Sequence, residues 1–154
     1  MSDDKKYKLN YLFVRVFNQI LSWEEQSFKD MGISEITLRE LHVIEAVYSL
    51  LESGNNRMSE IAKYLAITPG SLTTAVNCLV KKGFLERETS ANDRRVVKIV
   101  PTHRAHEVNA LHEQFHKQMI ETITVDVAED DINTVIKILS NLNKFFNNNK
   151  ISRK

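Results

Sequence analysis

Several features that would mark other classes of protein are scarce or missing in this sequence. A single cysteine, Cys78, excludes an internal disulfide framework and fits a reducing compartment. There is no signal peptide, and no apolar run approaches a membrane span, so we expect a cytoplasmic protein without a membrane partner. The chain has only four glycines and no glycine-rich phosphate loop.

Groups arranged for catalysis are also missing. No paired carboxylates sit on predicted strands, and Cys78 lacks a positioned base that would activate its thiol. The acidic pair Asp130-Asp131 is better explained as charge at the start of a helix than as an acid–base pair. We therefore expect neither enzymatic activity nor a cofactor.

The composition allows one hydrophobic core. The chain has 154 residues, of which 42% are hydrophobic, and this is enough for one core but not for two. No repeat or linker divides it, so we expect a single domain over 1–154. The net charge is +1, yet the segment from Arg57 to Arg104 holds nine Lys/Arg against four Asp/Glu and is therefore +5, which leaves −4 elsewhere. Positive charge gathered in one segment favours a phosphate-binding surface there.

The segment from Arg57 to Val100 predicts two short helices followed by two strands. We expect the first helix to begin at Met58-Ser59-Glu60, with Ser59 as its N-cap. The second begins at Thr68-Pro69, where proline needs no N–H partner, and Gly83 ends it. Apolar residues at helical spacing predict its core-facing side: Leu72, Val76, Leu79 and Val80.

The opposite side of this second helix is small, polar and positively tipped, which suits a helix that enters a DNA major groove. Strands over 84–88 and 96–100 flank a basic tip and predict a β-hairpin, or wing, that can reach a minor groove. Together they predict a winged helix–turn–helix over 57–100. The residues expected to contact bases or backbone are Arg57, Ser71, Thr73, Thr74, Asn77, Lys81, Lys82, Arg94 and Arg95.

Four more helices are expected around this segment, which brings the total to six. The apolar period predicts helices over Tyr7–Lys29, Thr37–Leu51 and His103–Val125, and a last helix that starts near Glu129. We expect Met1–Lys6 to be frayed. The last helix is expected to bury Ile132, Val135, Ile136, Leu139, Leu142, Phe145 and Phe146.

The terminal helices are more apolar than a lone DNA-reading module needs. We expect residues of about 7–50 and 103–147 to build a two-fold homodimer with one reading head per subunit. Such a dimer would bind palindromic double-stranded DNA.

The order of these elements resembles the MarR family of bacterial transcription regulators. The segments that carry the resemblance are Ser59–Ala62, Thr68–Ser71, Lys81–Arg87 and Asp93–Val96, and it covers essentially the whole chain. It implies a mainly α winged helix–turn–helix with a small β-hairpin. It also implies that Asp93 pairs with a nearby arginine while Arg95 enters the minor groove.

Two further segments resemble the branch of this family that represses fatty-acid synthesis, of the FabT type: Ile33-Ser34 with Arg39–Ala46, and Leu111–Ile120. In that branch an acyl chain on acyl carrier protein is the co-repressor and lodges among the dimerisation helices. The same apolar residues are also expected in any helical core or dimer interface. The pocket that the resemblance implies is lined by Phe13, Phe17, Ile20, Ile44, Tyr48, Phe115 and Met119.

The histidines offer a competing effector site. His112 and His116 lie four apart on one helix, a spacing at which two imidazoles can share a metal, and His42 with Glu24 or Glu40 can complete the ligand set. A zinc-responsive branch of the family, which represses metal uptake, looks similar at these positions. The same histidines can instead form hydrogen bonds across the dimer interface.

The main alternative to a regulator is a helical interaction module that does not bind DNA. It would use the same amphipathic helices but would need neither the polar side of the second helix nor the arginines of the hairpin. The sequence therefore favours a dimeric repressor whose effector changes the spacing of its two reading heads.

Overall fold

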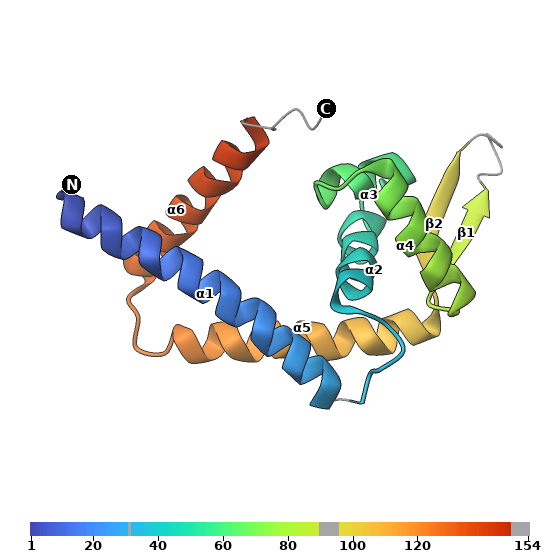
Figure 1. Cartoon of the computed structure of the whole chain (residues 1–154), viewed down its shortest axis with the longest axis horizontal. Helices are drawn as coiled ribbons and strands as arrows, with labels where there is room; N and C mark the ends of the chain where they lie inside the picture. Colours follow the sequence, from blue (N-terminus) through green and yellow to red (C-terminus); the bar gives the residue numbers. More distant parts are fainter. Residues whose placement is uncertain (31, 90–95, 149–154) are drawn as a thin grey trace. The chain divides into compact units, whose positions relative to one another are not determined.

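The computed structural model describes residues 1–30, 32–89 and 96–148. Within them lie six helices and an antiparallel hairpin, as the sequence predicts (Figure 1). The elements are α1 (Asp3–Asp30), α2 (Leu38–Leu51), α3 (Met58–Tyr64), α4 (Pro69–Lys81), β1 (Leu85–Thr89), β2 (Val97–Pro101), α5 (His103–Ile123) and α6 (Glu129–Asn148). The chain forms two compact units, Met1–Leu111 and the chain from His112 onward.

The core of the first unit lies between α2, α3, α4, the hairpin and the first turns of α5. Apolar side chains recur at helical spacing on the helices and at every second residue of β2, while β1 contributes only Leu85 to the core. Three of the four residues predicted for the core side of α4 are fully buried, and Val80 is half-buried against them. The fully buried apolar residues include Leu41, Ile44, Val47, Ile61, Leu72, Val76, Leu79, Leu85 and Ile99.

Local side-chain hydrogen bonds fix where two of these helices begin. Thr37 caps α2, because its hydroxyl oxygen accepts the backbone N–H of Glu40. The Glu40 carboxylate in turn accepts the backbone N–H of Thr37, and the two bonds form a capping box. Thr68 caps α4 by accepting the Ser71 N–H at 3.1 Å, and Pro69 follows it in the first turn. The predicted start of α4 is thus confirmed.

Other predicted boundaries are wrong by a few residues. Arg57 occupies the N-cap of α3 without a side-chain hydrogen bond, so Ser59 lies inside that helix rather than capping it. Helix α1 begins at Asp3, where an ion pair between Asp3 and Lys6 adds to the first turn, so the expected fraying through Lys6 is not observed. Both strands begin one residue later than predicted, at Leu85 and Val97.

Two turns position α4. Ala66, between α3 and α4, has φ of +53°, a left-handed conformation that is rare for a residue with a Cβ. Gly83 has φ of +77° and ends α4 as predicted, so that the chain turns directly into the hairpin. In this hairpin, the antiparallel register pairs Arg87 of β1 with Ile99 of β2, and Glu88 with Lys98.

The prediction that α6 buries its apolar residues is wrong for the single chain. Val135, Ile136, Leu139, Phe145 and Phe146 are each at least half exposed. Much of α1 is also exposed and apolar, with Phe17 at 63% and Trp23 at 68%. Neither helix has the polar outer surface that a monomer would normally present.

Among the described residues, none of the helices combines the length and the apolar content needed to cross a membrane.

Candidate nucleic-acid interface

Helix α4 has two chemically different sides. One packs Leu72, Val76 and Leu79 into the core with no exposed surface. The other exposes every residue predicted to read DNA from this helix: Ser71, Thr73, Thr74, Asn77 and Lys81. The core stripe fixes the rotation of the helix about its own axis, and the polar residues consequently share the outward face.

The hydroxyls on this face are held by bonds within the helix. Thr73 donates to the Pro69 carbonyl at 2.8 Å, and Thr74 donates to the Gly70 carbonyl at 3.1 Å. The hydroxyl oxygens of Thr68 and Ser71 lie 2.8 Å apart. Each hydroxyl keeps lone pairs that can accept from a base, and each can rotate to donate to a phosphate. The face therefore offers both donors and acceptors to a nucleic acid.

Asn77 has a partner that the sequence analysis did not identify. Nη2 of Arg87, on β1, donates to Oδ1 of Asn77 at 2.6 Å, which ties the hairpin to the middle of the polar face. The strand pattern indicates only the face of β1 on which Arg87 lies, because side chains two apart on a strand share a face and Leu85 is buried. Arg87 thus extends on the α4 side of β1.

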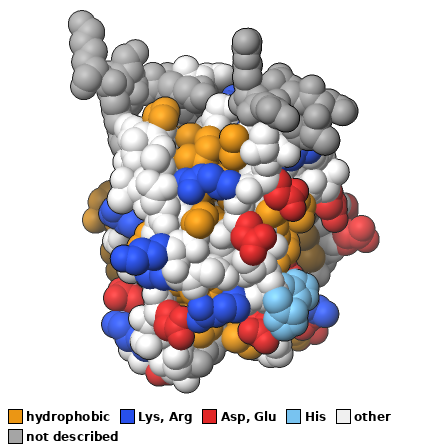
Figure 2. All heavy atoms as spheres, turned by 90° about the vertical axis from the view of Figure 1, so that its right-hand side faces the viewer, with side chains coloured by type: hydrophobic (Ala, Val, Ile, Leu, Met, Phe, Trp, Pro, Cys, Tyr) orange, Lys and Arg blue, Asp and Glu red, His pale blue; other side chains and the backbone are white. Residues whose placement is uncertain are grey.

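Arg57 lies beside the hairpin as well. The preceding residue, Asn56, is buried and exchanges hydrogen bonds with Ile99: its Nδ2 donates to the Ile99 carbonyl at 2.7 Å, and its own carbonyl accepts the Ile99 N–H at 2.8 Å. Arg57 then forms an isolated antiparallel bridge with Lys98. This pairing sets two cationic residues side by side at the hairpin. Figure 2 shows Lys and Arg side chains spread over this end of the molecule, with acidic side chains among them.

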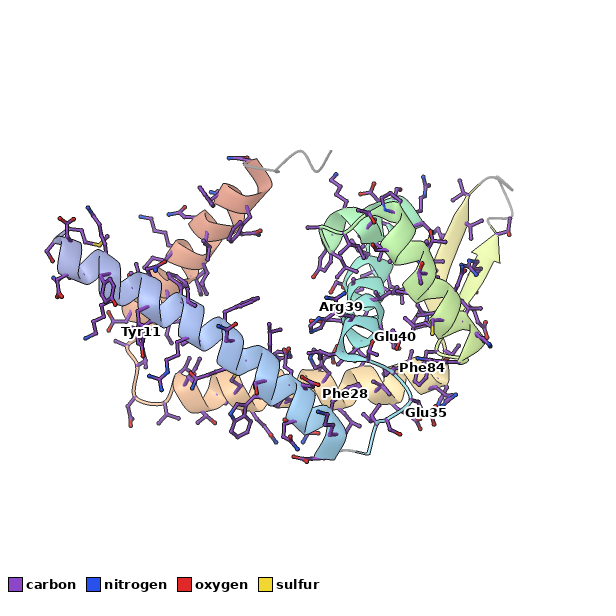
Figure 3. The ribbon with its side chains drawn as sticks, in the orientation of Figure 1. Tyr11, Phe28, Glu35, Arg39, Glu40 and Phe84 are labelled. Carbon is purple, nitrogen blue, oxygen red and sulfur yellow. The ribbon has the colours of Figure 1, made fainter. Side chains whose placement is uncertain are left out.

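Lys82, which the sequence analysis expects to contact the DNA backbone, has a partner within the protein. Its Nζ lies 2.9 Å from both carboxylate oxygens of Glu40, and the two side chains are 30% and 9% exposed. Figure 3 labels Glu40 on α2. Burial raises the pKa of Glu40, but hydrogen bonds from Cys78, Lys82 and the Thr37 backbone outweigh it and lower the pKa to about 2. The hydrogen bond to Glu40 in turn raises the pKa of Lys82. The pair joins α2 to the C-terminal end of α4.

A second cation holds the same end of α4. Arg104, in the first turn of α5, donates through Nη1 to the Lys82 carbonyl at 2.6 Å and through Nη2 to the Glu35 carboxylate. Its guanidinium also lies 4.5 Å from the ring centroid of Phe84. Arg104 and Glu40 therefore fix where α4 ends.

The predicted wing-tip contacts, Asp93, Arg94 and Arg95, lie outside the described residues.

The residues predicted for an acyl pocket occupy different environments. In the first unit Ile44 is fully buried in the core, Phe17 is exposed, and Phe13, Ile20 and Tyr48 are half-buried. In the second unit Phe115 and Met119 are half-buried. A cavity of about 950 Å³ in the first unit is lined by other residues, from the end of α1 and the start of α2, among them Leu21, Phe28, Ile33, Ile36 and Leu38.

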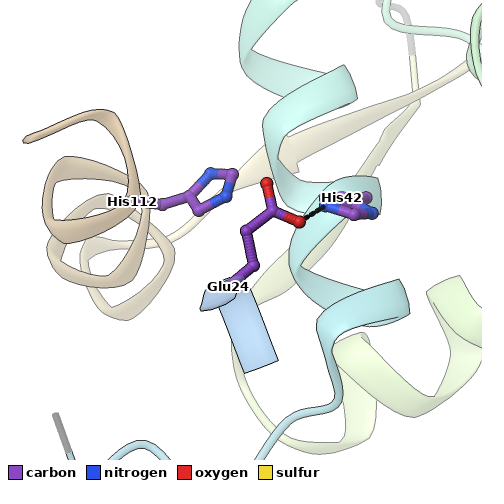
Figure 4. Close-up of side chains that lie close together, drawn as sticks. All are labelled: Glu24, His42 and His112. Carbon is purple, nitrogen blue, oxygen red and sulfur yellow. Dashed lines mark ion pairs between the residues drawn. The ribbon is translucent and has the colours of Figure 1, made fainter. Parts of the chain in front are cut away.

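The four candidate metal ligands form two close pairs. Glu24 of α1 and His42 of α2 lie 3.6 Å apart, between Oε2 and Nε2, and Glu24 is buried (Figure 4). In the second unit, the Nε2 atoms of His112 and His116 are 3.0 Å apart. Imidazoles this close on successive turns can share a proton or face one cation.

Curated relatives match part of the chain. The HTH-type transcriptional regulator YcgE of Bacillus subtilis is 28% identical over 90 residues, which are 58% of this chain and 54% of that protein. The regulator YwhA of the same organism is 27% identical over 89 residues, 58% of this chain and 64% of that one. The chain thus spans little more than half the length of these relatives. Both are named as transcriptional regulators and not as enzymes, in agreement with the expected absence of catalysis.

Solved structures match nearly the whole chain. Streptococcus pneumoniae FabT in complex with DNA is 31% identical, has a TM-score of 0.80, and the match covers 93% of this chain and 98% of that one. An S. aureus MepR–DNA complex, 19% identical with a TM-score of 0.75 over 94% and 99% of the two chains, shares the fold. The MarR family model matches residues 36–97, which hold the helix–turn–helix, β1 and the first residue of β2. The chain belongs to the MarR family.

Proposed function

We propose that this chain is a dimeric transcriptional repressor that binds palindromic double-stranded DNA. The observation that carries the proposal is the exposed polar face of α4, which lies on the opposite side of the helix from its fully buried apolar stripe. A helix whose outward side is small and polar fits into a major groove without a steric clash, and its hydrogen bonds to base edges offset the loss of water.

Each contact has an assigned role. Ser71, Thr73, Thr74 and Asn77 contact bases and nearby phosphates in the major groove, while Arg57 and Lys81 neutralise the flanking backbone. Lys82 positions α4 through Glu40 instead of contacting DNA. For the tip of the hairpin, the assignment rests on the sequence and the family resemblance: Arg95, with Arg94, enters the adjacent minor groove, and Asp93 orients an arginine of the tip.

A homodimer is proposed from the apolar surface of α1 and α6. Leu139, Phe145 and Phe146 are 50% to 62% exposed in the single chain, and covering them would remove this area from water. A second copy of the chain provides a matching surface by symmetry. The dimer then presents two copies of α4 to two half-sites.

Selection from a randomised duplex library tests DNA recognition. Recovered sequences should show two inverted half-sites whose centres lie about one helical turn, or a multiple of it, apart. Recovery without any enrichment would contradict the proposal and favour an interaction module. Replacing Thr74 by Ala, which removes an exposed hydroxyl together with its neighbouring methyl group, should reduce enrichment while the fold remains intact.

For the effector we propose a long acyl chain, carried on acyl carrier protein, and fatty-acid synthesis genes as targets. The likeness to FabT and the apolar residues of α1 and α5 support this assignment. The histidine pair of α5 supports the alternative, a zinc-responsive repressor. Native mass spectrometry of the purified protein separates them, because a bound lipid supports the first and bound zinc the second. Finding neither would contradict both.

A further inference from the structure

The polar face of α4 contains a contact between the recognition helix and the hairpin. Asn77 lies two turns after Gly70 in the helix and faces outward with Thr74. Arg87 reaches it from β1, the strand that runs beside α4 in Figure 1. The 2.6 Å bond joins Nη2 of Arg87 to Oδ1 of Asn77, and both side chains are exposed.

The chemistry of this contact defines how the amide is oriented. A guanidinium has only N–H donors, so it can bond the oxygen of an asparagine amide but not its nitrogen. The bond uses one of the two lone pairs of Oδ1 and turns this oxygen toward Arg87, so the Nδ2 group with its two N–H donors is the end of the amide that points away from β1. A free asparagine could turn either end outward.

The two orientations read different bases. An asparagine recognises adenine by accepting from N6 and donating to N7, which needs both ends of its amide. An amide that presents only donors suits the acceptors of guanine, O6 and N7, or O4 of thymine. Cytosine offers only a donor at the same edge.

We propose that Arg87 is a positioning residue that determines the base specificity of Asn77. It holds the amide so that Asn77 donates into the major groove, and the base pair beneath Asn77 is accordingly read as guanine or thymine in preference to adenine or cytosine. This inference rests on the proposed function, in which α4 enters the major groove.

The test is base-resolved selection from a randomised duplex library with the full-length wild type, Arg87→Met, Arg87→Lys and Asn77→Ala. Asn77→Ala locates the base position that Asn77 reads. At that position Arg87→Met should admit adenine and reduce discrimination by about tenfold, the scale of one good base contact. Arg87→Lys, which retains a donor, should restore part of the preference. A protein with both Arg87→Met and Asn77→Ala should select as Asn77→Ala alone does.

Arg39→Met is the matched control, because it removes an exposed positive side chain from α2 outside the polar face. It should leave the base preference unchanged. The inference is overturned if Arg87→Met keeps the wild-type preference at the Asn77 position and weakens binding equally for all sequences, as loss of a phosphate contact would. A wild type that enriches no sequence would instead overturn the proposed function itself. Thermal unfolding of Arg87→Met is expected to match that of the wild type.

Discussion

The ammonium of Lys82 lies 2.9 Å from both carboxylate oxygens of Glu40, and through this pair the start of α2 holds the end of the recognition helix. The two residues are 42 positions apart in the sequence. Because Glu40 also completes the capping box of α2, one carboxylate stabilises a helix start and a helix end. Positioning of α4 therefore depends on a side chain outside the helix–turn–helix.

Stability should depend on pH through Glu40. Its pKa is lowered from 4.5 to about 2 on folding, so the ion pair stabilises the protein above pH 4.5 and this contribution is lost as the pH falls toward 2. Glu40→Gln should reduce the free energy of unfolding at pH 7 by about 2–3 kcal/mol. Urea unfolding at pH 7 and pH 3.5 measures both effects. An equal loss of stability for wild type and Glu40→Gln between these pH values would contradict the assignment.

Gly70 should separate stability from DNA binding. A Cβ added at this position in the first turn of α4 would meet no atom within 4 Å, so packing within the protein does not require glycine. Gly70→Ala should leave the fold intact and stabilise it by up to about 1 kcal/mol. The added methyl group would face the DNA, however, and should weaken binding by about 1 kcal/mol. Thermal unfolding and a duplex titration measure the two changes, and unaltered affinity would place Gly70 away from the DNA.

Lys81 and Arg57 should contribute to the salt dependence of binding. Each phosphate contact releases a condensed counterion and occurs once in each subunit, so Lys81→Met and Arg57→Met should each reduce the log–log salt slope of the dimer by about 2. The exposed Lys117 of α5 provides the control, since Lys117→Met should leave the slope unchanged. Equal slopes for all four proteins would rule out these phosphate contacts.

Leu139 should be required for dimerisation. It is half exposed in the single chain and lies on the apolar side of α6, so Leu139→Glu would bury a charge in the proposed interface. Sedimentation should show a monomer that binds the palindrome at least about tenfold more weakly, because only one half-site is engaged at a time. Asn141→Glu adds the same charge at an exposed polar position of α6 and should remain dimeric. A dimeric Leu139→Glu would exclude this surface.

Local sequence patterns predicted the helices and strands, but they did not predict contacts between residues that are far apart in the sequence. The stripe from Leu72 to Leu79 and the Thr68-Pro69 start predicted α4 correctly, because helix period and capping are properties of neighbouring residues. The bond between Arg87 and Asn77 depends on how a strand packs against a helix, which no local pattern specifies. The partner of Lys82 was not predicted for the same reason, since Glu40 lies in another helix.

The apolar period of α6 illustrates a different limit. The pattern correctly predicted an amphipathic helix, but periodicity does not distinguish a side that packs within one chain from a side that packs against a second copy. Leu139 and Phe146 were expected to be buried and are exposed in the single chain.

The central claim is that the outward face of α4 reads DNA sequence. The most direct test compares the affinity of the wild type for its selected palindrome with its affinity for a scrambled duplex at one salt concentration. The palindrome should bind at least about 1,000-fold more tightly, and Asn77→Ala should lose part of this ratio. Equal affinity for the two duplexes would contradict the claim that α4 reads DNA sequence. A ratio of the two affinities that is the same for Asn77→Ala and the wild type would also contradict it.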